Sequence, residues 1–208
     1  MRWLASLLIV SLLPAAPQHG QRQGQKRGEG RGLARMLEQP GRAAWQKPEE
    51  VVRALALRPD EVVADIGAGT GYFTRRFAPL VARVYAVDVN QRLLEQIDAL
   101  GLANVTTVLA AADDPRLPEA TVDTVFFCNV LHHISSRPDY YRKLVRALKP
   151  GGRIVVIDFH KRPLPVGPPE SEKLSEQEVI DELGRAGFRL EKSHGWLDYQ
   201  YFLEFRPR

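Results

Sequence analysis

Residues 61–72 read Glu-Val-Val-Ala-Asp-Ile-Gly-Ala-Gly-Thr-Gly-Tyr, an apolar run followed by three glycines within five residues. The run from Val62 to Ile66 is typical of a buried strand in a parallel sheet, because helices cover both faces of such a strand. The glycines predict a sharp turn that lets another group approach the backbone closely. Residues 72–79 then have the pattern of a short helix. A strand, a glycine turn and a helix start make the corner at which α/β sheets bind nucleotides.

The spacing of Gly67, Gly69 and Gly71 distinguishes two kinds of nucleotide corner. A dinucleotide site reads G-x-G-x-x-G, but here the third glycine comes one residue early and Tyr72 stands where the last glycine belongs. Asp65 also places a carboxylate at the end of the strand. This acidic residue followed by G-x-G-x-G resembles the first motif of class I S-adenosylmethionine-dependent methyltransferases. That ligand has no phosphate, and a carboxylate suits its ammonium and sulfonium cations. An ordinary strand-to-helix turn is the alternative.

A second carboxylate stands at the end of the next predicted strand, residues 83–88. Asp88 follows Gly71 by 17 residues. At this distance a carboxylate can accept hydrogen bonds from both ribose hydroxyls of an adenosine, and the resemblance gives the acidic residue here that role. An N-cap for the helix predicted over residues 91–100 is compatible with the same residue.

The resemblance implies further cofactor contacts in the loops that follow the strands. After the predicted strand at 104–110, the sequence Ala-Ala-Asp-Asp-Pro-Arg-Leu-Pro departs at two positions from the Gly-Asp-Ala-x-x-Leu-Pro pattern of related enzymes. Asp113 aligns with the aspartate that binds the adenine amine in those enzymes, and Asp114 replaces their alanine. The other positions expected at the cofactor are Gly67, Ala68, Gly69, Gly71, Val89, Ala112 and Asn129.

Three histidines are candidates for the reaction itself. The run Leu-His-His-Ile at residues 131–134 follows the predicted strand 122–128 and resembles small-molecule methyltransferases, including those acting on quinones, sterols and arsenite. His132 or His133 could serve as a general base, or could equally tie this loop by a hydrogen bond. His160 follows the predicted strand 153–159, where it and Asp158 could act on the acceptor. The proline-rich segment that begins there is either a cover for the substrate or a plain connector.

The distribution of charged residues and the number of cysteines limit the kinds of partner that this chain can bind. The formal net charge is +4, but residues 1–60 hold 10 Lys and Arg against 5 Asp and Glu, so the remainder is close to neutral. This distribution argues against a basic nucleic-acid-binding face. The sequence after Asn129 also lacks the Pro-Pro-aromatic motif of enzymes that methylate base nitrogens. Cys128 is the single cysteine, which excludes an intrachain disulfide and a cysteine-based metal cluster. We predict no metal.

The N-terminal 44 residues differ in composition from the rest of the chain. Residues 1–16 contain one Arg and then about ten apolar residues, which is typical of a signal peptide or membrane-tethering segment. Residues 17–44, rich in Gly, Gln and Arg, predict a basic linker that could touch anionic lipid. We therefore expect an exported or membrane-tethered protein, with a misassigned start before a cytoplasmic enzyme as the alternative. The methyltransferase-like domain is expected over residues 45–208, with Trp45 at the mouth of the site.

The C-terminal part completes the expected sheet. Ser175 and Glu178 have the spacing of a capping box for a helix to about residue 186, and strands are expected at 188–194 and 199–205. The resemblance implies an α/β, Rossmann-like, doubly wound sheet of seven strands, mostly parallel with an antiparallel last strand. It also implies S-adenosylmethionine as cofactor and SN2 transfer of a methyl group to a small-molecule acceptor. The alternatives are an NAD-binding oxidoreductase and a non-catalytic S-adenosylmethionine-binding domain.

Overall fold

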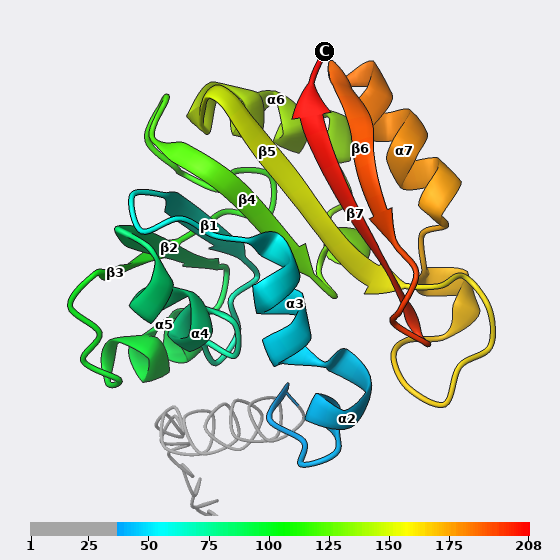
Figure 1. The fold of residues 1–208 in the computed structure, drawn as a ribbon, viewed down its shortest axis with the longest axis horizontal. Coiled ribbons are helices and arrows are strands. Elements are labelled where there is room, and N and C mark those ends of the chain that lie inside the picture. The colour runs from blue at the N-terminus through cyan, green and yellow to red at the C-terminus, as the bar shows by residue number, and fades with distance from the viewer. Residues whose placement is uncertain (1–36) are drawn as a thin grey trace, which may run out of the picture.

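A computed structural model describes residues 37–208 of the chain (Figure 1). Seven strands form one sheet in the order β3-β2-β1-β4-β5-β7-β6. The strands are β1 Val62–Ile66, β2 Arg83–Asp88, β3 Val105–Leu109, β4 Val122–Cys128, β5 Leu148–Phe159, β6 Phe188–His194 and β7 Gln200–Pro207. Neighbours from β3 to β5 pair in parallel, whereas β7 runs antiparallel to both β5 and β6. The predicted fold class is therefore confirmed, including the antiparallel last strand.

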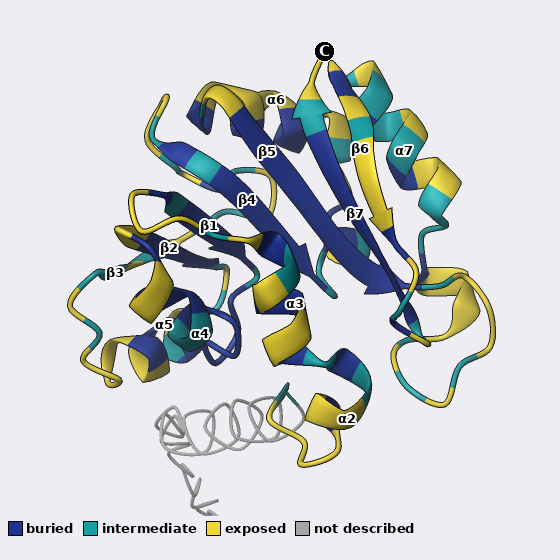
Figure 2. Cartoon of the chain, in the orientation of Figure 1, coloured by how far each residue is buried: buried dark blue, intermediate teal, exposed yellow. Residues whose placement is uncertain are grey.

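Helices cover both faces of this sheet. They are α2 Arg42–Gln46, α3 Pro48–Leu55, α4 Thr74–Phe77, α5 Gln91–Asp98, α6 Arg137–Ala147 and α7 Glu176–Arg185, with short 3-10 turns η1 Ala78–Leu80, η2 Leu131–His133 and η3 Glu170–Glu172. One core cluster joins α3 and α4 to the sheet, and a second cluster joins α6 and α7 to the sheet. Strands β5 and β7 have the longest unbroken runs of buried residues, as Figure 2 shows. Two covered faces explain why β5 carries the apolar run Ile154 to Ile157 in its centre.

The elements follow the sequence pattern closely in most places. The capping box at Ser175 is present, with its hydroxyl accepting from the Glu178 N–H and the Glu178 carboxylate accepting from the Ser175 N–H. Strand β5 is the exception, because it begins at Leu148 instead of Arg153. The Pro-Gly-Gly segment expected to lie between helix and strand falls inside this early part of the strand. There the register against β4 shifts between Val122 and Thr124.

Residues 37–44 pack on the domain, although the sequence assigned them to the linker. The Glu38 carboxylate accepts hydrogen bonds from the Thr70 hydroxyl and from both terminal nitrogens of Arg75. The predicted signal or tethering segment, residues 1–16, and the first part of the linker lie outside the described residues. Within residues 37–208, no helix has the length and apolar character needed to span a membrane.

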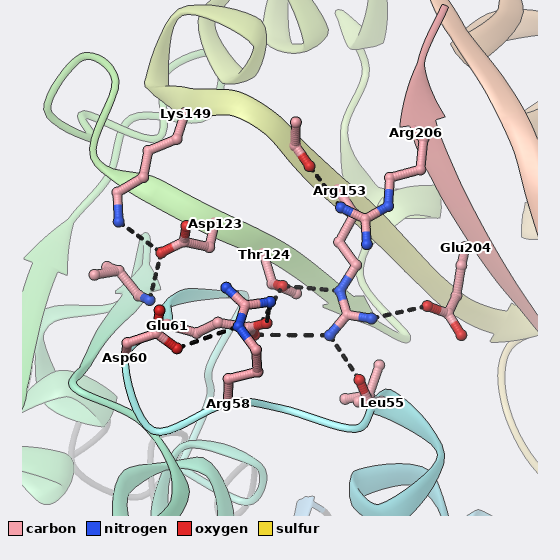
Figure 3. A network of polar contacts seen from close by, with 12 residues as sticks. Leu55, Arg58, Asp60, Glu61, Asp123, Thr124, Lys149, Arg153, Glu204 and Arg206 are labelled. Atoms are coloured by element: carbon pink, nitrogen blue, oxygen red, sulfur yellow. Dashed lines mark hydrogen bonds and ion pairs between the residues drawn. The ribbon is translucent and has the colours of Figure 1, made fainter.

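A buried polar network holds the amino-terminal ends of the central strands (Figure 3). Arg153, within β5, donates to the Thr124 hydroxyl on β4, the Glu204 carboxylate on β7 and the Leu55 carbonyl at the end of α3. Its guanidinium also lies 3.7 Å from the Glu61 carboxylate. The opposite, carboxyl-terminal edge of the sheet is the edge at which open α/β sheets bind ligands.

Candidate active site

The glycine turn that follows β1 has the conformation that the sequence predicted. Gly67, Gly69 and Gly71 have φ angles of +68°, +59° and +84°, in the region that residues with a Cβ avoid. The chain's own side chains approach this turn closely. A Cβ on Gly67 would lie 2.1 Å from Val130 Cγ2, and one on Gly69 would lie 3.0 Å from Leu37 Cδ1. The turn is therefore covered by Leu37 in this structure.

Asp65 lies fully inside the protein at the end of β1. Its carboxylate accepts a hydrogen bond from the Thr74 hydroxyl at 2.6 Å, so it also ties the start of α4. Burial raises the pKa of Asp65 to about 6, and the hydrogen bonds from Thr74 only partly oppose this. A carboxylate that is this poorly solvated gains strongly from a nearby cation.

Asp88 ends β2 beside the glycine turn. One carboxylate oxygen accepts the Gly69 N–H at 2.9 Å and the other accepts the Asn90 N–H at 2.8 Å. The N-cap of α5 is Asn90, whose side chain accepts from the Arg92 N–H, so Asp88 is not the cap. Because each carboxylate oxygen has a second lone pair, Asp88 can still accept from two hydroxyls.

The remaining predicted cofactor positions are placed less uniformly. Ala68 is buried against Ala86 and the apolar side of α5, so its side chain faces the core. Val89 is 63% exposed beside Asp88. Ala112 and Asp113 are exposed in the turn after β3, where the Asp113 carboxylate lies 3.4 Å from Lys143 Nζ. Asp114 accepts the Arg116 N–H, and its carboxylate also lies 3.4 Å from Lys143 Nζ. These positions stay predictions.

A buried histidine–carboxylate pair joins the ends of β4 and β5. His132 Nδ1 lies 2.8 and 2.9 Å from the two Asp158 oxygens, and the side chains are 3% and 1% exposed. The carboxylate is further fixed by the Phe159 N–H at 2.9 Å. We assign the Nδ1–H tautomer to His132 because a carboxylate only accepts, which leaves Nε2 able to take up a proton.

The other two candidate histidines have different surroundings. His133 lies at the protein surface. The partial loss of solvent around its ring and the charge of the neighbouring His132 lower the pKa of His133. His160 Nδ1 lies 3.0 Å from the Glu176 carboxylate at the start of α7, so its partner is Glu176 and not Asp158. The sequence named His160 and Asp158 as candidates to act on the acceptor, and this stays a prediction. The two side chains have different partners, because His160 already lies beyond the end of β5.

Three amide side chains form a closed ring across the same edge. Gln46 donates to the Gln200 carbonyl oxygen at 2.7 Å, Gln200 donates to the Asn129 oxygen, and Asn129 donates back to the Gln46 oxygen at 3.2 Å. Asn129 has a φ of +59° just after β4. Trp45 packs on Phe159 with ring centroids 5.7 Å apart. This ring fastens α2 to the ends of β4 and β7.

Sequence reasoning missed one residue of this region, Arg42 of α2. Arg42 is 9% exposed, and its guanidinium lies 3.8 Å above the centre of the Tyr72 ring. The charge of Arg42 acts on both Asp65 and Cys128, at the ends of β1 and β4. Composition put Arg42 in a basic, Gly-rich segment, and nothing local distinguishes it from the arginines around it.

Comparison with known proteins gives one consistent result. Residues 64–156 match the model of a family described as methyltransferase domain. The chain is 34% identical over 113 residues to a ubiquinone/menaquinone biosynthesis C-methyltransferase (UbiE) of Ectopseudomonas mendocina, a match covering 50% of this chain and 44% of that protein. The protein with the same name from Pasteurella multocida is also 34% identical, over 50% of this chain and 42% of its own length. The chain thus spans less than half of the curated relatives it matches.

Solved structures agree with the sequence relatives. The crystal structure of a SAM-dependent methyltransferase from Aquifex aeolicus superposes with a TM-score of 0.79 at 28% identity. This match covers 84% of this chain and 97% of the Aquifex aeolicus chain.

Proposed function

Because the chain carries a class I S-adenosylmethionine-dependent methyltransferase domain, we propose that it methylates a small-molecule acceptor with S-adenosylmethionine as methyl donor. The observation that carries the proposal is the row of polar side chains along one edge of the sheet. Asp88, Asp65 and the His132–Asp158 pair stand at the ends of β2, β1, β4 and β5 in that spatial order. An edge of this kind is where such sheets bind their ligands.

The residues at β1 and β2 fit the cofactor. S-adenosylmethionine, when bound, supplies an electrophilic methyl group on a sulfonium. Asp88 retains lone pairs for the two ribose hydroxyls, and the buried Asp65 carboxylate suits a cation. Since Leu37 covers Gly69, we expect its side chain to move aside when adenosine enters.

The residues at β4 and β5 fit an acceptor that loses a proton. His132 Nε2 takes the proton from an acceptor hydroxyl or acidic carbon, while Asp158 holds the ring and stabilises its positive charge. The acceptor's electron pair forms the new bond to carbon, and sulfur keeps the pair of the broken bond. Positioning and exclusion of water supply much of the remaining rate.

We propose a phenol or quinol as the acceptor class. A ring hydroxyl of this kind has a proton that a histidine can remove, and loss of the proton activates both the oxygen and the ring carbons beside it. The name of the UbiE relatives, which are C-methyltransferases of quinone biosynthesis, supports the same class. Membrane contact through the N-terminal segment would bring the enzyme close to apolar quinols, and it is part of this proposal.

The test is transfer of radiolabelled methyl from S-adenosylmethionine to a panel of phenols and quinols. We expect His132→Gln to lower kcat about 100-fold or more, as for loss of a general base. The acidic limb of the pH–rate profile should disappear, while the affinity for S-adenosylmethionine stays the same. His133→Gln is the matched control and should leave kcat nearly unchanged.

Two results would contradict the proposal at different levels. An unchanged kcat in His132→Gln would remove the general base and leave the methyltransferase assignment intact. Calorimetry in which the wild-type chain binds NAD and not S-adenosylmethionine would overturn the assignment itself.

A further inference from the structure

Arg42 is a buried cation that forms no ion pair within the described residues, although its charge reaches the buried Asp65 carboxylate. The guanidinium donates from Nη1 to the Leu37 carbonyl at 2.7 Å, but its Nε–H has no hydrogen-bond partner. Among the ion pairs within residues 37–208, none includes Arg42. A guanidinium taken out of water without an anion costs free energy, so this arrangement favours binding of an anionic group.

The surroundings of Arg42 place it at the centre of the site. The charge of Arg42 opposes the burial that raises the pKa values of Asp65 and Cys128, which end adjacent strands β1 and β4. The order of the sheet reverses between these two strands, and ligands bind in the crevice at such a reversal. Tyr72 lies under the guanidinium, and its hydroxyl is also buried without a partner. Two buried donors without partners therefore belong to side chains that are in contact with each other.

We propose that Arg42 binds the carboxylate of the amino-acid end of S-adenosylmethionine. This inference rests on the proposed function and extends it to one group of the cofactor. The amino-acid end carries one anion beside its cations. Arg42 supplies the positive partner for the carboxylate, and Asp65 supplies the negative partner for the ammonium group. A guanidinium and a carboxylate form paired, charge-assisted hydrogen bonds, which a free Nε–H makes possible here.

The position of Arg42 depends on how α2 is attached. Gln46 at the end of α2 belongs to the amide ring with Asn129 and Gln200, and Lys47 Nζ donates to the Trp196 carbonyl at 3.0 Å. Glu38 before the helix is tied to Thr70 and Arg75. The helix is thus held at both ends across the strand edge, and Arg42 faces inward from its first turn.

The test compares three ligands by isothermal titration calorimetry on the full-length chain. S-adenosylmethionine carries the carboxylate, decarboxylated S-adenosylmethionine lacks only that group, and 5′-methylthioadenosine lacks the whole amino-acid end. We expect the wild-type chain to prefer S-adenosylmethionine over the decarboxylated form by about 10- to 100-fold, as for a hydrogen bond between charged groups. In Arg42→Gln this preference should vanish, with the affinity for 5′-methylthioadenosine unchanged.

Arg76→Gln is the matched control. The Arg76 guanidinium also lies over the Tyr72 ring, at 4.3 Å, but it is paired with Glu49. Arg76→Gln removes one positive charge close to Tyr72, as Arg42→Gln does. It should nevertheless leave unchanged the preference for S-adenosylmethionine over its decarboxylated form. Arg42→Lys should retain part of that preference, because lysine keeps the positive charge but cannot donate the two parallel hydrogen bonds of a guanidinium.

Several outcomes would overturn the inference while leaving the methyltransferase assignment standing. One is a wild-type chain that binds S-adenosylmethionine and its decarboxylated form equally well, a result that needs no variant to fold. Another is Arg42→Gln weakening all three ligands by the same factor, which would mean that Arg42 only supports the fold. A wild-type chain that binds none of the three ligands would instead overturn the proposed function, and this inference with it.

Discussion

Single carboxylates show the tension between stability and ligand binding in this protein. Asp65 is buried next to the apolar cores on both faces of β1, and Thr74 satisfies only part of its hydrogen-bonding capacity. Burial raises its pKa to about 6, against 3.8 for an exposed aspartate. The folded state therefore holds this proton more tightly than the unfolded state, so stability falls as pH rises from 3.8 through about 6.

We expect Asp65→Asn to stabilise the fold above pH 6 by about 1–3 kcal/mol, because a shift of one pKa unit is worth about 1.4 kcal/mol. The amide oxygen can still accept from Thr74. The gain should shrink across the window from about 6 down to 3.8 and vanish below it. The same change should weaken binding of S-adenosylmethionine. Urea denaturation of both proteins across this pH range measures the first effect, and calorimetry measures the second.

Asp60→Asn is the comparison for this prediction, since the Asp60 side chain is 78% exposed. It should change stability by less than about 0.5 kcal/mol at any pH. If Asp65→Asn were less stable than the wild type at neutral pH, the hydrogen bonds of the carboxylate would outweigh its burial.

The sequence alone could identify functional residues that stand at the end of a predicted strand. Asp65 and Asp88 were predicted because a carboxylate at the end of an apolar run lies at the end of a buried strand, and therefore at the edge of the sheet where ligands bind. Arg42 and the His132–Asp158 pairing were not predicted. Arg42 belongs to a segment with no apolar pattern, and His132 and Asp158 are 26 residues apart. Their meeting depends on β4 and β5 being neighbours, which no local pattern specifies.

At the scale of elements, the glycine turn has a second function besides ligand approach. Gly67 packs under Val130, Gly69 under Leu37 and Gly71 under Ile97, so each glycine receives a side chain from another element. The sequence correctly predicted close approach at this turn. It could not predict that the chain itself provides the approaching groups, because Val130 and Ile97 come from distant segments.

Gly67→Ala should therefore lose more stability than the left-handed backbone alone explains. The backbone strain costs about 1–2 kcal/mol, and the contact with Val130 should add about 1–3 kcal/mol more. Gly101→Ala is a matched control, because Gly101 has φ +65° and nothing within 4 Å of an added Cβ. Denaturation midpoints of the two variants give the difference, and equal losses would show that Val130 moves away freely.

Strand β5 shows how an element boundary escapes local rules. The Pro-Gly-Gly run marks a break after α6, and the helix does end there, at Ala147. Pairing of Leu148 with Val122 then extends the strand backward, across a register shift. Proline and glycine are tolerated at such a shift, because an irregular ladder needs fewer donors and no regular side-chain packing.

At the scale of the whole molecule, Arg153 connects elements that are far apart in the sequence. Its guanidinium contacts α3, β4 and β7, and it is 10% exposed. The network, drawn in Figure 3, involves Glu61 and Thr124 near the beginnings of β1 and β4, whereas the candidate site lies at the opposite ends of these strands. It was absent from the sequence predictions, because an arginine at the start of a strand usually reaches solvent.

Arg153→Leu should destabilise the protein by about 3–5 kcal/mol, because it removes the buried guanidinium that pairs with Glu204 and lies near Glu61. Among the described residues, Glu204 then keeps only His194 as an ion-pair partner, and Glu61 keeps only Arg58. Affinity for S-adenosylmethionine in the folded fraction should not change. Arg146→Leu is the control, as its pair with Glu119 is 70% exposed on both sides and should cost less than about 1 kcal/mol. Equal losses in guanidinium denaturation would mean that the Arg153 network contributes no more than a surface pair.

The circle formed by Gln46, Asn129 and Gln200 has one more consequence. Each side chain gives one proton and receives one, so reversing any single carboxamide would set donor against donor on one side and acceptor against acceptor on the other. All three must turn together or not at all. A ligand that donated a hydrogen bond to the Asn129 oxygen would displace the Gln200 N–H and leave it without an acceptor. Such a ligand would therefore disturb the contacts of α2 with β4 and with β7 at the same time.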